Sequence, residues 1–146
     1  MVEVARDFAT RKGDVLARLR EPALDGWVAT AGDGGVHLVP LSLAWLDGCV
    51  VVAVESSSRT AVNLRADPKV RVGMGHTRDV VMVEGRFERE APAGEVGQRY
   101  AEQADWDPRG AEGYVYLVIR PTRIQAWRES NELPGRTLMR DGEWLS

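Results

Sequence analysis

Apolar residues follow a helical spacing in one part of the chain and an alternating pattern in most of the rest. Residues 4–19 place apolar side chains near one face of a helix, which predicts an amphipathic helix. Pro22 lies just beyond, and the residue before a proline disfavours helical backbone, so the helix ends there. Two shorter helices are predicted, one after a Ser57 or Ser58 cap and one over residues 91–104, which Gly94 and Gly97 weaken.

Short apolar runs separated by turn signals predict β-strands. The pair Asp47-Gly48 between two such runs is a hairpin signal, and Pro121 indicates a bend or an edge position within the last run. A further Asp-Gly pair in residues 138–145 indicates a terminal hairpin. The six main runs lie at residues 26–30, 36–45, 49–55, 69–74, 80–89 and 114–127.

The links between these runs are short except for one, and short links favour antiparallel pairing. The sequence therefore predicts a mainly β fold with short helices, a six-stranded antiparallel split β-barrel, because closing a small sheet removes its exposed edges. An open sheet covered by helices is the competing arrangement.

Length and composition limit the number of domains, the kinds of partner and the cellular location that we expect. A chain of 146 residues predicts a single domain over residues 1–146. The net charge of −3 argues against nonspecific nucleic-acid binding, and no apolar run is long enough to span a membrane. The first residues lack the apolar stretch of a secretory signal, so we expect a cytoplasmic protein. One cysteine excludes an internal disulfide and a multi-cysteine metal site, and no metal site is predicted.

The sequence Ser57-Ser58-Arg59-Thr60 follows a predicted strand and begins a short helix. Free backbone N–H groups, hydroxyls and one guanidinium at a helix start suit a phosphate group. A well-capped surface helix with an exposed arginine explains the same residues and is, on these grounds alone, the more common case.

Other chemistry-bearing residues give weaker signals. His37 and His76 are best interpreted as surface or edge histidines, although His76 lies in a turn that a ligand can reach. Cys49 lies within an apolar run and is predicted to be buried. No hydrolase elbow, phosphate-binding loop or dinucleotide glycine pattern is present. The acidic loop around Trp106 is best interpreted as solvated, and Trp106, Trp127 and Trp144 as packing residues or as covers for a flat ligand.

The run VHLVPLSLAWLDGCVVVAVESSSRTAVNLRADPKVRVGM, followed by VVMVEGRFER, resembles the flavin-binding split-barrel family typified by pyridoxamine 5'-phosphate oxidase. The similarity covers roughly residues 25–90 and includes relatives that use the deazaflavin F420. The elements that carry it are the Asp-Gly turn, the strand ending in Ser-Arg, and the short helix with Asn-Leu before Asp-Pro.

The resemblance implies a homodimer with two cofactor sites at the subunit interface. It assigns the binding of the cofactor phosphate to Ser58 and Arg59. Thr60 stands where the family has a lysine, and Arg65 or an arginine of the partner chain is expected to replace the missing positive charge. The strand along the ring system falls on residues 39–43. The full set of implied cofactor-binding residues is Val39, Pro40, Leu41, Ser42, Ser57, Ser58, Arg59, Thr60, Asn63, His76 and Trp127.

The function implied is an oxidoreductase that binds FMN, or alternatively F420, and transfers hydride to or from a small organic substrate. Val80 stands where pyridoxamine oxidases carry an amide, and their Arg-x-His element has no counterpart, so that specific activity is not expected. The alternatives are a non-catalytic carrier of flavin, F420 or haem, with His76 or His37 as haem ligand, and a barrel that serves only as an interaction module. Proton delivery is expected from solvent or His76, and no nucleic-acid or membrane partner is expected.

Overall fold

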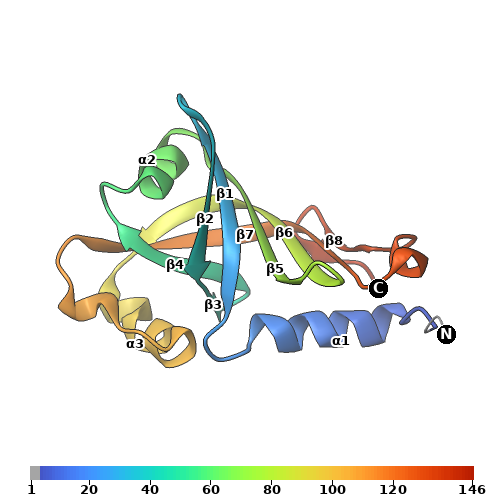
Figure 1. Cartoon of the computed structure of the whole chain (residues 1–146). Helices are drawn as coiled ribbons and strands as arrows, with labels where there is room; N and C mark the ends of the chain where they lie inside the picture. Colours follow the sequence, from blue (N-terminus) through green and yellow to red (C-terminus); the bar gives the residue numbers. More distant parts are fainter. Residues whose placement is uncertain (1–3) are drawn as a thin grey trace.

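A computed structural model describes residues 4–146 and shows an antiparallel, mainly β protein with three α-helices (Figure 1). The helices are α1 (Phe8–Leu19), α2 (Arg59–Ala66) and α3 (Ala93–Ala104), with short 3-10 turns at η1 (Pro108–Gly110) and η2 (Ser130–Glu132). The strands are β1 (Asp25–Gly32), β2 (Gly35–Ser42), β3 (Ala44–Leu46), β4 (Cys49–Glu55), β5 (Lys69–His76), β6 (Asp79–Ala91), β7 (Tyr114–Trp127), β8 (Thr137–Arg140) and β9 (Glu143–Trp144).

The sheet runs in the order β2-β1-β5-β6-β7-β4-β3, and β8 pairs with β7 and β9. The first six strands of this path are the six that the sequence predicts, so the mainly β, antiparallel architecture is confirmed and is consistent with a split barrel. The predicted terminal hairpin is present as β8 and β9.

The predicted strand at residues 36–45 divides in two at Leu43. β2 pairs with β1 up to Ser42, whereas β3 pairs with β4 from Ala44 onward. Leu43 is buried, and its backbone N–H donates to the carbonyl of Leu24 at 2.8 Å. This residue therefore carries the chain from one end of the sheet to the other, which brings β2 close to β4.

The continuous apolar run of β4 reflects burial on both faces. Val50, Val52 and Val54 point into the main core inside the curved sheet. Cys49 and Val51 point outward into a second core, which α3 covers through residues such as Val96 and Tyr100. A strand buried on both sides has no polar alternation, and the buried Cys49 agrees with its predicted role.

Pro121 lies at a bulge in β7. The register against β6 shifts so that Glu84 faces Arg123 while Gly85 faces Pro121. β7 pairs with β4 up to Ile119 and with β8 from Ile124, so the proline lies between these two partners. The predicted bend is thus present, and Pro121 lies in a stretch of β7 where β6 is the partner strand.

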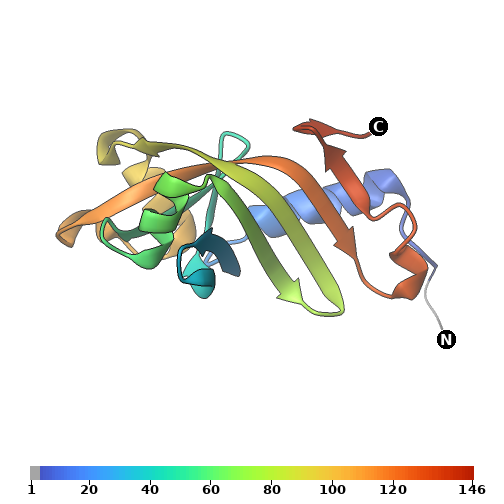
Figure 2. The same cartoon turned by 90° about the horizontal axis from the view of Figure 1, so that it is seen from above.

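The first helix begins later than the predicted residue 4. Asp7 is extended and accepts a hydrogen bond from the Thr10 N–H at 2.8 Å, so it caps a helix that starts at Phe8. α1 passes along one side of the sheet, with its N-terminal end near the C-terminal strands (Figures 1 and 2). None of the helices within residues 4–146 is long and apolar enough to cross a membrane.

Candidate functional site

The loop between β4 and α2 places one free cation at the start of a helix. Ser58 is the N-cap of α2, and its hydroxyl accepts from the Ala61 N–H at 3.2 Å. Arg59 follows as the first helical residue, is exposed, and has no hydrogen bond or ion pair from its side chain among the described residues. The predicted cap is present, and it uses Ser58 while leaving Arg59 free.

Arg65 holds this loop in place rather than offering a free charge. Its guanidinium donates to the Ser56 carbonyl at 2.6 Å and to the Ser56 hydroxyl at 2.9 Å. The same group forms an ion pair with Glu90 at 2.8 Å. The expectation that Arg65 replaces the missing family lysine is therefore corrected: its donors already serve Ser56 and Glu90.

Thr60 and Asn63 lie on the inner face of α2. Each is 2% exposed. Asn63 donates from its side-chain amide to the Thr30 hydroxyl at 3.1 Å, which fastens α2 to β1. The structure therefore places both residues behind the site as supports of the helix, not on a surface that a cofactor can touch.

A pocket of about 400 Å³ lies where the ends of β2 and β4 meet the Ser58 loop. It brings together four of the predicted residues, Pro40, Leu41, Ser42 and Ser58. Ala53, Val54 and Glu55 of β4 complete that side. The remaining predicted residues on these elements are close in the chain: Val39 precedes Pro40 on β2, and Ser57 and Arg59 flank Ser58.

Two aromatic residues form another wall of the pocket: the sequence predicts Trp106 as a packing residue or a cover for a flat ligand and assigns no role to Tyr114. Trp106 and Tyr114 line it, with ring centroids 5.3 Å apart in an edge-to-face contact. They belong to the loop after α3 and to the start of β7. Covering a flat ligand is one of the two roles that the sequence gives Trp106, but nothing near it in the chain indicates that it faces residues 40–58.

A short hydrogen-bonded chain links this wall to the predicted ring strand. The Trp106 indole N–H donates to the Tyr100 hydroxyl at 3.3 Å, and that hydroxyl donates to the Ser42 carbonyl at 3.1 Å. Burial raises the pKa of Tyr100, so its phenol keeps the proton that it donates. The hydrogen bond from the protonated Tyr100 hydroxyl therefore fixes the position of the Ser42 carbonyl.

One acidic residue near Trp106, Asp107, is engaged with arginine. Asp107 accepts from Arg109 at 2.7 Å, and these hydrogen bonds lower the pKa of Asp107 to about 2. Within residues 4–146 no group of histidine, cysteine, aspartate or glutamate side chains is arranged to hold a metal ion.

His76 and Trp127 lie at the far end of the sheet from the Ser58 loop. His76 ends β5, seven positions beyond Lys69, and a strand of that length covers roughly 23 Å. Val80, the second residue of β6, is opposite Trp127, and β6 begins just after the turn that follows His76. Within one chain, the predicted site residues therefore form two groups that lie far apart. His37 belongs to neither group, because it lies on β2 opposite Thr30.

Comparison with known proteins gives a family match over most of the chain. A family described as pyridoxamine 5'-phosphate oxidase matches residues 15–128. No protein with a curated description matches the sequence.

Solved structures share the fold at low sequence identity. An F420 reductase is 22% identical with a TM-score of 0.61, over 73% of this chain and 92% of that one. A FAD-binding protein from Mesorhizobium loti is 27% identical with a TM-score of 0.56, over 74% and 88% of the two chains. A heme binding protein from Mycobacterium smegmatis is 18% identical with a TM-score of 0.66, over 96% of this chain and 60% of that one.

Proposed function

Because the chain belongs to the pyridoxamine 5'-phosphate oxidase family, we propose that it binds a flavin-type cofactor, FMN or alternatively F420, as an oxidoreductase for a small organic substrate. The observation that carries this proposal is the pocket bounded by Pro40, Ser58 and Trp106, with the free Arg59 guanidinium beside its Ser58 side. Apolar and aromatic walls suit a flat ring, and one unpaired cation at a helix start suits its phosphate.

Each part of the pocket has a role in this proposal. Arg59 and the backbone N–H groups at the start of α2 bind the phosphate, while residues 39–42 lie along the ring. Trp106 and Tyr114 exclude water from the opposite side, and Tyr100 keeps the Ser42 carbonyl in position. The cofactor, when bound, supplies the hydride chemistry.

A homodimer completes the site in this proposal, because one chain holds His76 and Trp127 far from Ser58. The outer face of β1 and β2 supports such an assembly: Trp27 is 56% exposed and Leu38 57% exposed. Trp27 faces Pro40 across the two strands, so this apolar surface leads to the edge of the pocket. A partner packed there brings a second chain next to the ring strand.

We do not propose pyridoxamine 5'-phosphate oxidation for this chain. Val80 and Trp127 face each other at the far end of the sheet, and valine offers no amide to a cofactor. The Arg-x-His element also has no counterpart.

A non-catalytic carrier of flavin, F420 or haem is the second candidate. The lining of the pocket supports it, since Glu55 and Tyr114 are the titratable side chains there and no histidine is among them. A carrier needs a fitted pocket but no acid or base. Similarity to a heme binding protein adds haem to the ligands that must be tested.

The visible spectrum of the purified protein, followed by titration with FMN, F420 and haem, tests these proposals. We expect FMN or F420 to bind with a Kd below about 100 μM, near −5.5 kcal/mol. Reduction of the bound cofactor by a nicotinamide or deazaflavin donor supports the enzyme, and a bound cofactor that no donor reduces supports the carrier. Failure of both FMN and F420 to bind overturns the proposed function.

A further inference from the structure

A groove of about 570 Å³ adjoins the pocket at Ser58. The two share Glu55, so they lie on either side of its side chain. The rest of the groove is lined by Ser56 and Ser57, by α2 and by the residues just before β7. None of its lining residues belongs to β1 or β2, whose outer face the second subunit covers in the proposed homodimer.

A phosphate bound at the start of α2 lies where the pocket meets this groove. Arg59, the proposed anchor, and Val62, which lines the groove, are three positions apart on α2 and therefore share one face of the helix. Ser58, which precedes Arg59, lines the pocket. Any part of a cofactor that continues beyond its phosphate therefore meets the groove.

The groove presents two carboxylates whose charge is not neutralised. Glu55 and Glu112 are exposed, and their side chains have no ion pair or hydrogen bond within residues 4–146. The Ser56 N–H donates to the Gly113 carbonyl at 2.8 Å, which keeps Glu112 beside the loop. Arg65 also lines the groove, but its guanidinium already binds Ser56 and Glu90.

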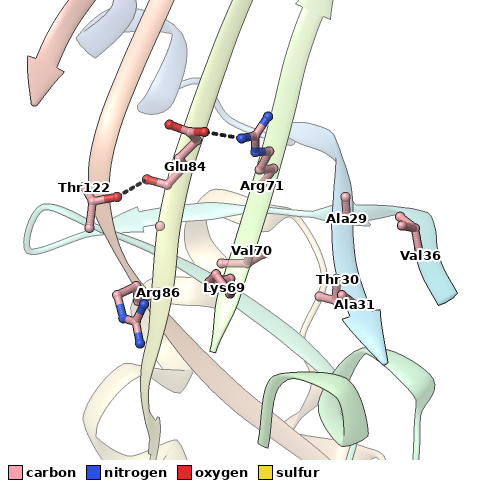
Figure 3. Close-up of a pocket in the computed structure, with 11 residues that line it drawn as sticks. Ala29, Thr30, Ala31, Val36, Lys69, Val70, Arg71, Glu84, Arg86 and Thr122 are labelled. Atoms are coloured by element: carbon pink, nitrogen blue, oxygen red, sulfur yellow. Dashed lines mark hydrogen bonds and ion pairs between the residues drawn. The ribbon is translucent and has the colours of Figure 1, made fainter. Parts of the chain in front are cut away.

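Other free cations of the sheet belong to a different pocket. Lys69 and Arg86 have no ion pair among the described residues, and they line a pocket at β1, β5 and β6 (Figure 3). That pocket shares no lining residue with the groove. Arg59 is therefore the cation that a ligand meets at the start of α2, and in the proposed function the cofactor phosphate occupies it.

We propose that the site selects a cofactor that ends at its phosphate, FMN, over F420, and that Glu55 and Glu112 are the residues that determine this specificity. The inference rests on the proposed function. FMN ends in a phosphate monoester, which Arg59 and the helix N–H groups bind. F420 continues beyond its phosphate with a lactate and a chain of glutamates, whose carboxylates meet Glu55 and Glu112 with no free cation in the groove lining. Like charges placed in this way reject one ligand without adding a contact to the other.

Two forms of F420 that share the ring and the phosphate test the role of the tail. One carries no glutamate and the other carries several, and both are titrated into the full-length protein at low ionic strength and followed by cofactor fluorescence. We expect the form without glutamate to bind about three- to tenfold more tightly, and the difference to shrink as salt is added. FMN, titrated alongside, should also bind more tightly than the form with glutamates.

The double variant Glu55→Gln/Glu112→Gln should bring the ratio of the two F420 affinities close to one. Because the two forms share ring and phosphate, an effect of Glu55 on those parts cancels in this ratio. Asp141→Asn/Glu143→Gln is the matched control: it removes the same charge from exposed positions of the terminal hairpin, which lines neither the groove nor the pocket, and should keep the wild-type ratio.

The inference is overturned if the form with glutamates binds as tightly as the form without, or if the Glu55/Glu112 variant keeps the wild-type ratio. It is also overturned if the control variant changes the ratio equally. In each of these cases a flavin-type cofactor still binds, so the proposed function stands. Failure of FMN and of both F420 forms to bind overturns the proposed function together with this inference.

Discussion

The side-chain amide of Asn63 donates a hydrogen bond to the Thr30 hydroxyl at 3.1 Å, at a point where both residues are at most 3% exposed. The bond joins α2 to β1. Because α2 begins at Arg59, this buried hydrogen bond, which lies outside the proposed cofactor pocket, fixes the position of the proposed phosphate anchor.

Replacing Asn63 with alanine should lower the free energy of unfolding by about 1–3 kcal/mol, because the Thr30 hydroxyl then remains buried without its donor. Urea denaturation measures the difference. Val62→Ala is the matched control, since Val62 is the neighbouring helical residue and is 44% exposed. Its effect should stay within about 0.5 kcal/mol. Equal losses in the two variants would contradict the role given to the buried amide.

Arg59→Ala should weaken FMN or F420 binding by about 1–3 kcal/mol, or roughly 5- to 150-fold, because it removes the unpaired cation at the start of α2. Isothermal titration or cofactor fluorescence measures the loss. Arg20→Ala is the control for net charge, as Arg20 is also exposed but lies after α1. Unchanged affinity in Arg59→Ala would show that Arg59 does not anchor the phosphate.

Trp106→Ala should lower cofactor affinity more than Trp106→Phe, because phenylalanine retains an aromatic wall opposite residues 40–42. The intrinsic tryptophan fluorescence should also fall less on cofactor binding in both variants. Trp144→Phe is the control, since Trp144 lies on β9 beneath the Lys12 ammonium group. If quenching is the same in the Trp106 variants as in the wild type, Trp106 does not face the ring.

The alternation of apolar residues was sufficient to predict the strands but not how the chain moves between them. Residues 36–45 look like one strand because Leu43 continues the apolar pattern. In the structure, Leu43 is the residue at which the chain stops pairing with β1 and begins to pair with β4. Its apolar side chain packs into the core at that bend. Pro121 likewise indicated an interruption, but the bulge depends on the register of β6, which is not local information.

The candidate site was predictable where its residues are consecutive in the chain. Pro40, Leu41 and Ser42 meet Ser58 because β2 and β4 lie close together, as a split barrel requires. Thr60 and Asn63 belong to the same motif, but helical geometry turns them toward β1 and away from the surface. Trp106 reaches the pocket from a loop about fifty residues later, a contact that spacing alone does not specify.

The buried ion pair between Arg6 and Glu132 joins the start of the chain to the turn after β7. The Arg6 guanidinium donates to both carboxylate oxygens of Glu132, at 2.7 and 2.9 Å, and the backbone N–H of Arg128 donates at 2.8 Å. Glu132 is 2% exposed. The hydrogen bonds from Arg6 lower the pKa of Glu132 from its usual 4.5 to about 2.

Glu132→Gln should therefore destabilise the protein by up to about 3 kcal/mol at pH 7, because Arg6 loses its buried counter-charge and keeps only the more exposed carboxylate of Asp14. The folded pKa lies below the unfolded one, so the stabilisation is fully present above about pH 4.5 and is lost as the pH falls toward 2. Denaturation at a series of pH values should show the difference between wild type and variant shrinking over this window. Glu129→Gln is the control: Glu129 pairs with Arg78 on the surface, where such pairs contribute about 0–1 kcal/mol. A difference for Glu132→Gln that stays constant from neutral to acidic pH would show that the carboxylate charge is not what stabilises this contact.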